Sequence, residues 1–221
     1  MGFGSVSKTV RRDNAGDRDL RSPPRINMNM RKLFSFLRRP RKGNPMTFVK
    51  VPYKNLLIQV APDYYMDDGI RIPVDLRDAH RIADENDCML PTTEMVDAIW
   101  QNADIRLPPR PLTPQNTGDS RFYNNIADPK WVKVHNDIVE QQLREAGANP
   151  GELIAGHKKD IVAHDVNSSR IAIYGWHRTS GRPIQPRSTV HGWNYKDYSQ
   201  GLRLVSRIAF DKDGNTVRFT E

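Results

Sequence analysis

The chain has 221 residues and a mean hydropathy of −0.70, and no stretch approaches the roughly 20 apolar residues of a membrane-spanning helix. Its single cysteine, Cys88, excludes a framework of internal disulfide bonds. The net charge of +8 is uneven, because residues 1–45 hold 12 of the 34 basic but only 3 of the 26 acidic residues, which leaves 22 basic and 23 acidic residues in the remainder. A basic segment therefore precedes an almost neutral body.

Residues 1–45 are predicted to form an extended basic arm. The segment is rich in glycine and proline and has few large apolar residues, so it cannot bury enough surface to fold alone. Its only apolar patch, residues 33–37, is too short for a secretory signal peptide, and we expect none. The arm could bind nucleic acid or an anionic surface, thread between subunits, or be a solvated leader. Its candidate binding residues are Arg31, Lys32, Arg38, Arg39, Arg41 and Lys42.

The body, residues 46–221, opens with strand and helix patterns. Two β-rich runs, 47–51 and 55–60, predict a hairpin. Residues 75–84 predict a helix whose apolar face holds Leu76, Ala79, Ile82 and Ala83. A second helix is expected over 94–100, capped by Thr92 or Thr93, with Met95, Ala98 and Ile99 turned inward.

The middle of the chain predicts a connector and a third helix. Prolines between 107 and 118 favour an extended, stiff segment. A helix is expected over 129–146, with an apolar stripe of Trp131, Val134, Ile138 and Leu143.

The final third predicts strands at 159–163, 170–174, 183–186, 201–210 and 216–219, the last two forming a hairpin. Strands and helices do not alternate as in βαβ units. We therefore expect an α+β fold with a mainly antiparallel sheet and about three helices.

Polar motifs at 156–160, 176–177 and 191–199 supply side chains suited to acid–base chemistry or metal binding. His191 and Asp197, with His157 or His177 as a third ligand, could hold Zn²⁺. The alternative is that these are surface histidines and hydrogen-bonded tyrosines. The candidate catalytic residues are His157, Asp160, His177, His191 and Asp197.

Cys88 lies just before a predicted helix start, where the helix dipole would lower a thiol pKa and create a nucleophile. Unpaired cysteines are also among the most buried residue types, and we favour a place in the core.

Four motifs together resemble an uncharacterised family of bacterial and phage-encoded proteins. They are Leu90-Pro-Thr-Thr-Glu-Met-Val-Asp97, Gly156-His-Lys-Lys-Asp160, Tyr174-Gly-Trp-His177 and Asp197-Tyr-Ser-Gln-Gly201. The resemblance implies an active site, for which we expect the class of cell-envelope hydrolases. The family motif usually has histidine where this chain has Gln200, which implies that this member has lost the reaction if that histidine acts in it.

A second resemblance covers residues 78–83, 90–94 and 201–205. These are similar to the formylglycine-generating-enzyme branch of the C-type-lectin-like fold, which phages also use at receptor-binding tips. The cysteines expected near the end of that enzyme family are absent from this chain, so this resemblance implies a binding module.

Our leading hypothesis is a structural or assembly-associated protein of a phage particle, located in the virion or the host cytoplasm and attached to other subunits through the arm. The alternatives are a peptidoglycan hydrolase that uses the His/Asp cluster, with zinc as a cofactor, and a lectin-like receptor-binding module. Convergence of the candidate side chains in one place would favour the hydrolase hypothesis.

Overall fold

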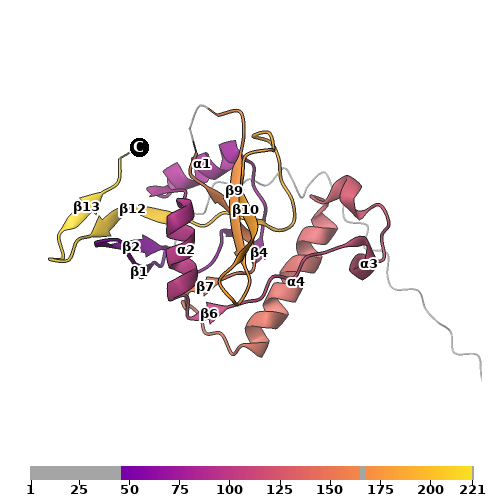
Figure 1. Cartoon of the computed structure of the whole chain (residues 1–221), viewed down its shortest axis with the longest axis horizontal. Helices are drawn as coiled ribbons and strands as arrows, with labels where there is room; N and C mark the ends of the chain where they lie inside the picture. Colours follow the sequence, from indigo (N-terminus) through magenta and orange to yellow (C-terminus); the bar gives the residue numbers. More distant parts are fainter. Residues whose placement is uncertain (1–45, 165–167, 221) are drawn as a thin grey trace, which may run out of the picture. The chain divides into compact units, whose positions relative to one another are not determined.

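The computed structural model describes residues 46–164 and 168–220. The predicted basic arm, with all six of its candidate binding residues, lies outside this part of the chain. The described residues form an α+β body of mostly antiparallel sheets with interspersed helices, as the sequence predicted (Figure 1).

The first sheet joins both ends of the body. It contains β1 (Val49–Tyr53), β2 (Leu56–Val60), β12 (Val205–Phe210) and β13 (Thr216–Arg218) in that order, and β5 (Cys88–Met89) also pairs with β12. Both predicted hairpins are confirmed, since β1 pairs antiparallel with β2 and β12 with β13. The turn of the first hairpin is tighter than predicted and lies at Lys54, so that Pro52 and Tyr53 belong to β1.

The second sheet carries the candidate site residues. Its order is β10 (Pro183–Ser188), β9 (Ala172–His177), β8 (Lys159–Val162) and β11 (Gln200–Gly201). The β8–β11 pair is parallel and the other two pairs are antiparallel. Two small pairs complete the strands: β3 (Met66–Asp67) with β4 (Ile70–Arg71), and β6 (Ile105–Arg106) with β7 (Ile154–Ala155).

Helix α1 (Leu76–Glu85) and helix α2 (Thr93–Asn102) each begin at a capping side chain, and the predicted cap of α2 is confirmed at Thr92. The side chain of Asp75 accepts a hydrogen bond from the Asp78 amide, and Thr92 accepts one from the Met95 amide. The predicted apolar face of α1 is confirmed, because all four of its residues are buried. Helix α2 packs against β1 of the first sheet and β9 of the second, and it stands between the two sheets in Figure 1.

The proline-rich connector differs from the prediction. Residues 107–118 are not extended throughout, since Pro114–Thr117 form a single helical turn, α3. The side chain of Thr113 caps this turn, and Pro114 sits at a first-turn position where no amide hydrogen is needed. Gly118, with φ of 67°, ends it, and a 3₁₀ turn (Phe122–Asn125) follows.

Helix α4 (Pro129–Glu145) is present, but its predicted apolar stripe is partly wrong. Val134 is 39% exposed, whereas His135, Asn136 and Gln142 are buried together with Trp131, Val132 and Val139. Asn136 accepts a hydrogen bond from the guanidinium of Arg71 on β4, Gln142 donates to the Pro108 carbonyl, and His135 packs against the rings of Trp176 and Tyr198. Within the described residues, no helix is both long and apolar enough to span a bilayer.

Gly156 allows two backbone segments to meet beside the second sheet. Its φ is +92°, and a Cβ atom there would lie 2.4 Å from the carbonyl oxygen of Leu107 and 3.2 Å from that of His177. We expect Gly156→Ala to lower the free energy of unfolding by about 3 kcal/mol or more, since backbone must move and a left-handed conformation is strained. Urea denaturation measures this.

Gly214→Ala is the matched control. Gly214 has a similar φ of +84°, but a Cβ there would meet nothing within 4 Å. We expect the free energy of unfolding of this variant to decrease by only about 1 kcal/mol, the cost of placing alanine in a left-handed conformation. Equal decreases in the free energy of unfolding of the two variants would show that Gly156 is not needed for the close approach of the two backbone segments.

Candidate functional site

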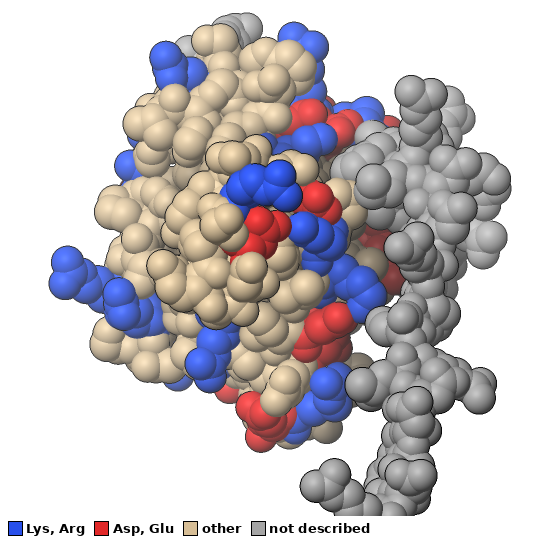
Figure 2. All heavy atoms as spheres, turned by 90° about the vertical axis from the view of Figure 1, so that its right-hand side faces the viewer, with Lys and Arg blue, Asp and Glu red and all other residues tan. Residues whose placement is uncertain are grey.

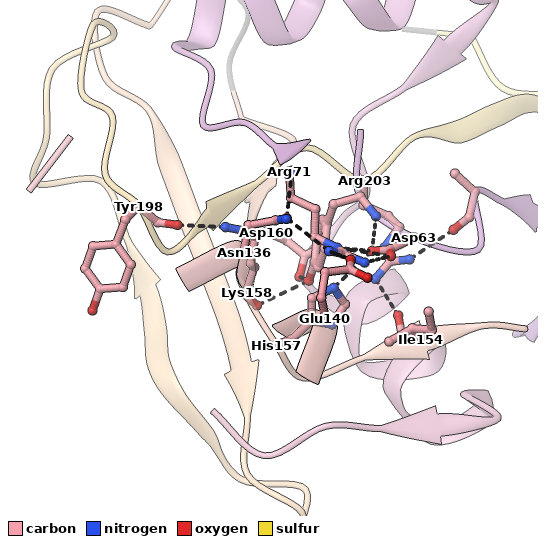
Figure 3. Close-up of polar contacts among 12 residues, drawn as sticks. Asp63, Arg71, Asn136, Glu140, Ile154, His157, Lys158, Asp160, Tyr198 and Arg203 are labelled. Atoms are coloured by element: carbon pink, nitrogen blue, oxygen red, sulfur yellow. Dashed lines mark hydrogen bonds and ion pairs between the residues drawn. The ribbon is translucent and has the colours of Figure 1, made fainter. Parts of the chain in front are cut away.

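Arg71 is the centre of a buried ionic cluster beneath the second sheet (Figure 3). Its Nε and Nη2 atoms donate to the carboxylate of Asp63, with Nη2 2.5 Å from Oδ2. Its Nη1 atom donates to Glu140 Oε1 at 2.6 Å and to Asn136 Oδ1 at 3.1 Å. Because Arg71 is only 1% exposed, its charge is compensated by protein groups.

His157 joins this cluster through Asp63. The two side chains lie 3.0 Å apart, from His157 Nε2 to Asp63 Oδ1, and the imidazole is fully buried. Burial lowers the pKa of His157 to about 4 although Asp63 opposes the shift. Burial acting alone would raise the pKa of Asp63, but His157 and Arg71 outweigh it and hold that pKa well below its usual range. Near neutral pH, a neutral imidazole therefore donates to an ionised carboxylate.

Asp160 lies on β8 on the other side of Tyr64. The Tyr64 hydroxyl donates to Asp160 Oδ2 at 2.9 Å, and the Tyr64 ring makes an edge contact with His157, with ring centroids 4.8 Å apart. The Arg203 guanidinium lies over the same ring, 4.1 Å from its centroid. Burial raises the pKa of Asp160 to about 7 although Arg203 opposes the shift. The Asp160 carboxyl group is thus poised to gain or lose a proton near neutral pH.

His177, at the end of β9, is oriented by a carboxylate from α2. His177 Nε2 lies 2.9 Å from Asp97 Oδ1, which also accepts a hydrogen bond from the Tyr174 hydroxyl at 2.8 Å. The Trp100 ring stacks on the imidazole, with centroids 5.7 Å apart. Burial lowers the pKa of His177 and Asp97 opposes this shift. The Asp97 side chain is 42% exposed, so this pair reaches solvent.

The other two candidate residues belong to a different cluster. Asp197 accepts hydrogen bonds from Lys159 Nζ at 2.5 Å, from the Tyr195 hydroxyl at 2.7 Å, and from the amide and hydroxyl of Ser199. Burial would raise the pKa of Asp197, but Lys159 and the hydroxyl donors lower it. His191 stacks on the Tyr195 ring, with centroids 3.6 Å apart, and interacts electrostatically with Lys159 and Asp197.

The structure thus brings the predicted residues together in part. His157 and Asp160 both contact Tyr64, and Asp160 and His177 flank Gly175, whereas His191 and Asp197 lie around Tyr195. The proposed zinc arrangement is not formed in the described part of the chain, where no three His, Cys, Asp or Glu side chains are placed to hold a metal ion. The imidazoles of His157 and His177 pair with separate carboxylates instead.

The sequence missed the roles of the partners that set these environments, namely Asp63, Tyr64, Arg71, Asp97, Tyr174 and Arg203. Asp97 and Tyr174 lay within the motifs 90–97 and 174–177, but neither was a candidate site residue. One further signal was available, because the polar residues His135, Asn136 and Gln142 share a helical face with Val132 and Val139. Polar side chains inside an apolar stripe indicate a polar partner across the interface.

The nucleophile interpretation of Cys88 is wrong. Cys88 lies in strand β5 rather than at the helix start, and it is completely buried. Burial, assisted by Asp87, raises the pKa of its thiol to about 12. The favoured interpretation, a core residue, is confirmed.

We expect iodoacetamide to alkylate Cys88 in urea-unfolded protein and to leave it essentially unmodified in the folded protein at pH 8, because the thiolate is both suppressed and enclosed. Mass spectrometry of the intact chain measures the modification. Rapid alkylation of folded protein would contradict the placement of Cys88.

Comparisons with known proteins add no assignment, since no family model, curated protein or solved structure matches this chain.

Proposed function

We propose that this chain is a structural or assembly-associated protein of a large particle, such as a phage virion, and that residues 1–45 attach it to an anionic component of that particle. The observation that carries the proposal is the division of charge, with 12 basic and 3 acidic residues before residue 46 and 22 basic and 23 acidic residues after it. Clustered basic side chains supply affinity for polyanions that does not depend on a folded site.

The described body supports this division because its charges compensate one another. Arg71 and Lys159 form buried pairs with Asp63 and Asp197. On the surface, basic side chains pair with neighbouring acids, as Lys133 does with Asp137. On the face shown in Figure 2, basic and acidic side chains lie interspersed. A surface of this kind gives a polyanion little to bind.

The experiment compares the full chain with a variant in which the six candidate arm residues are replaced by glutamine. Each protein is produced in the cells in which the particle assembles, and the cell lysates are fractionated by sedimentation. We expect the wild-type chain to sediment with a large particle and the variant to remain with free protein. Sedimentation of the wild type as free protein, or of the variant with the particle, would contradict the proposal.

A matched control removes the same number of charges from the body. It replaces six exposed basic residues by glutamine, namely Arg110, Arg121, Arg144, Arg178, Arg182 and Lys212. This variant should still sediment with the particle, because the decrease in net charge is equal but the arm is intact.

A further inference from the structure

The turn between β3 and β4 has a sequence that favours a spontaneous chemical change. Asp68 and Gly69 are its two turn residues, because Asp67 pairs with Ile70. Both have positive φ angles, 52° and 76°, as a two-residue turn of this hand requires. In an Asp-Gly sequence the aspartate side chain can close a ring with the next amide nitrogen, since glycine has no side chain to obstruct it.

The amide nitrogen of Gly69 is open to such an attack. Asp68 and Gly69 are both exposed, and a Cβ atom built at Gly69 would meet nothing within 4 Å. Among the residues that the structure describes, none accepts a hydrogen bond from the Gly69 amide. Ring closure at this turn therefore breaks no hydrogen bond of that amide.

The sequence has one other Asp-Gly pair, Asp213 and Gly214, which is also exposed but is held by hydrogen bonds. The Gly214 amide donates to the Asp211 carbonyl at 3.1 Å. The Asp211 carboxylate accepts from the amides of Asp213 at 2.9 Å and Asn215 at 2.8 Å. An amide that donates a hydrogen bond must release it before its nitrogen can attack, so the structure slows ring closure at this second site.

We propose that Asp68 is a site of spontaneous isomerisation to isoaspartate in the folded protein, whereas Asp213 is protected. The Gly69 nitrogen bonds to Cγ of Asp68, and the acid hydroxyl leaves as water with the amide proton, which gives a succinimide. Water then opens the ring at either carbonyl. Opening at the main-chain carbonyl leaves the main chain running through the Asp68 side chain, so one water is released and one is consumed.

Isomerisation acts on the buried ionic cluster, because it lengthens the main chain two residues before Arg71. The Asn136 side chain of α4 accepts hydrogen bonds from the Arg71 amide and from Arg71 Nη1, both at 3.1 Å, and its Nδ2 atom lies 3.5 Å from the Gly69 carbonyl oxygen. A longer turn disturbs the register in which Met66 pairs with Arg71. It thereby displaces Arg71 from α4 and lowers the stability of the modified protein.

The test follows isoaspartate in the full chain during incubation at pH 6 and 37 °C, beside a sample that is kept unfolded in urea. Trypsin releases Asp68 in the peptide 55–71 and Asp213 in the peptide 213–218. Protein isoaspartyl methyltransferase with labelled S-adenosylmethionine quantifies isoaspartate in each peptide, and electron-transfer fragmentation identifies the modified residue.

In urea, Asp68 and Asp213 should isomerise at similar rates, because no folded structure protects either residue. In the folded chain we expect Asp68 to isomerise about tenfold faster than Asp213, the factor that corresponds to one amide hydrogen bond. Asp68→Glu is the matched control, since its longer side chain must close a larger ring. It should abolish isoaspartate at position 68 and leave the rate at Asp213 unchanged.

Equal rates at the two residues in the folded chain, or a slower rate at Asp68, would overturn the proposal. If Asp68→Glu does not fold, the two wild-type peptides decide by themselves. The isomerised chain is finally separated by ion-exchange chromatography and unfolded in urea. Its midpoint should lie below that of the unmodified chain, and an unchanged midpoint would contradict the effect on Arg71.

Discussion

Replacement of Arg71 by methionine should lower the free energy of unfolding by about 3–5 kcal/mol, because it leaves the buried carboxylate of Asp63 without its cationic partner. The same change also removes the donor groups that face Glu140 and Asn136. Methionine fills much of the vacated volume, so the destabilisation reports mainly the uncompensated charge and not a cavity. Urea denaturation at pH 7 measures it.

Arg218→Met provides the matched control. Arg218 also forms a 2.5 Å ion pair, with Asp87, but the two side chains are 54% and 56% exposed. We expect a far smaller destabilisation than for Arg71→Met, because solvent screens an exposed pair. A second variant, Arg71→Met with Asp63→Asn, should recover part of the stability, since the buried charge is then removed. Similar effects at Arg71 and Arg218 would show that the buried cluster has no special energetic role.

Asp160→Asn should stabilise the protein increasingly as the pH rises from 4 to 7. In the unfolded wild type the carboxyl ionises near its ordinary pKa of 3.8, whereas in the folded protein burial raises its pKa to about 7. Between these values the unfolded state releases a proton that the folded state keeps, so wild-type stability falls as the pH rises. Above pH 7 both states are ionised and the whole penalty of up to about 4 kcal/mol is present. Asparagine does not titrate and avoids it.

Asp197→Asn should show the opposite trend, because the pKa of Asp197 is lowered in the folded protein. Its ionised form stabilises the fold above the unfolded-state pKa, and this contribution disappears as the pH falls through the folded-state value. Urea denaturation measures Asp160→Asn against the wild type from pH 4 to pH 8, and Asp197→Asn from about pH 5 downwards, because the folded-state pKa of Asp197 lies below its ordinary value of 3.8. Parallel curves for Asp160→Asn and the wild type would contradict the raised pKa.

The apolar part of the fold was predictable because its signals are local. Helix α1 was recognised from four apolar residues on one face, and both hairpins of the first sheet from alternating runs around turn residues. The Pro114–Thr117 turn was missed because prolines favour extended connectors in general, although the first turn of a helix tolerates them.

The polar partners were not predictable for a different reason. Arg71 pairs with Glu140, 69 residues away, and Asp97 pairs with His177, 80 residues away. Contacts between residues so far apart in the sequence depend on which helix face packs against which strand. The spacing of residues within one segment does not indicate this packing. The buried side of α4 was mispredicted for the same reason, since Asn136 meets Arg71, Gln142 meets the Pro108 carbonyl and His135 meets the rings of Trp176 and Tyr198.

We propose that attachment resides in the arm and not in the body. The decisive experiment measures the binding of the full chain to a short DNA duplex, used as a polyanion, over a series of salt concentrations. The plot of log affinity against log salt has a negative slope, and the magnitude of this slope should decrease by about 0.9 for each phosphate-binding side chain that is neutralised. We predict a much smaller slope when the six arm residues are glutamine and an unchanged slope for the body variant. Equal slopes for the wild type and the arm variant, or a larger effect of the body variant, would contradict the claim.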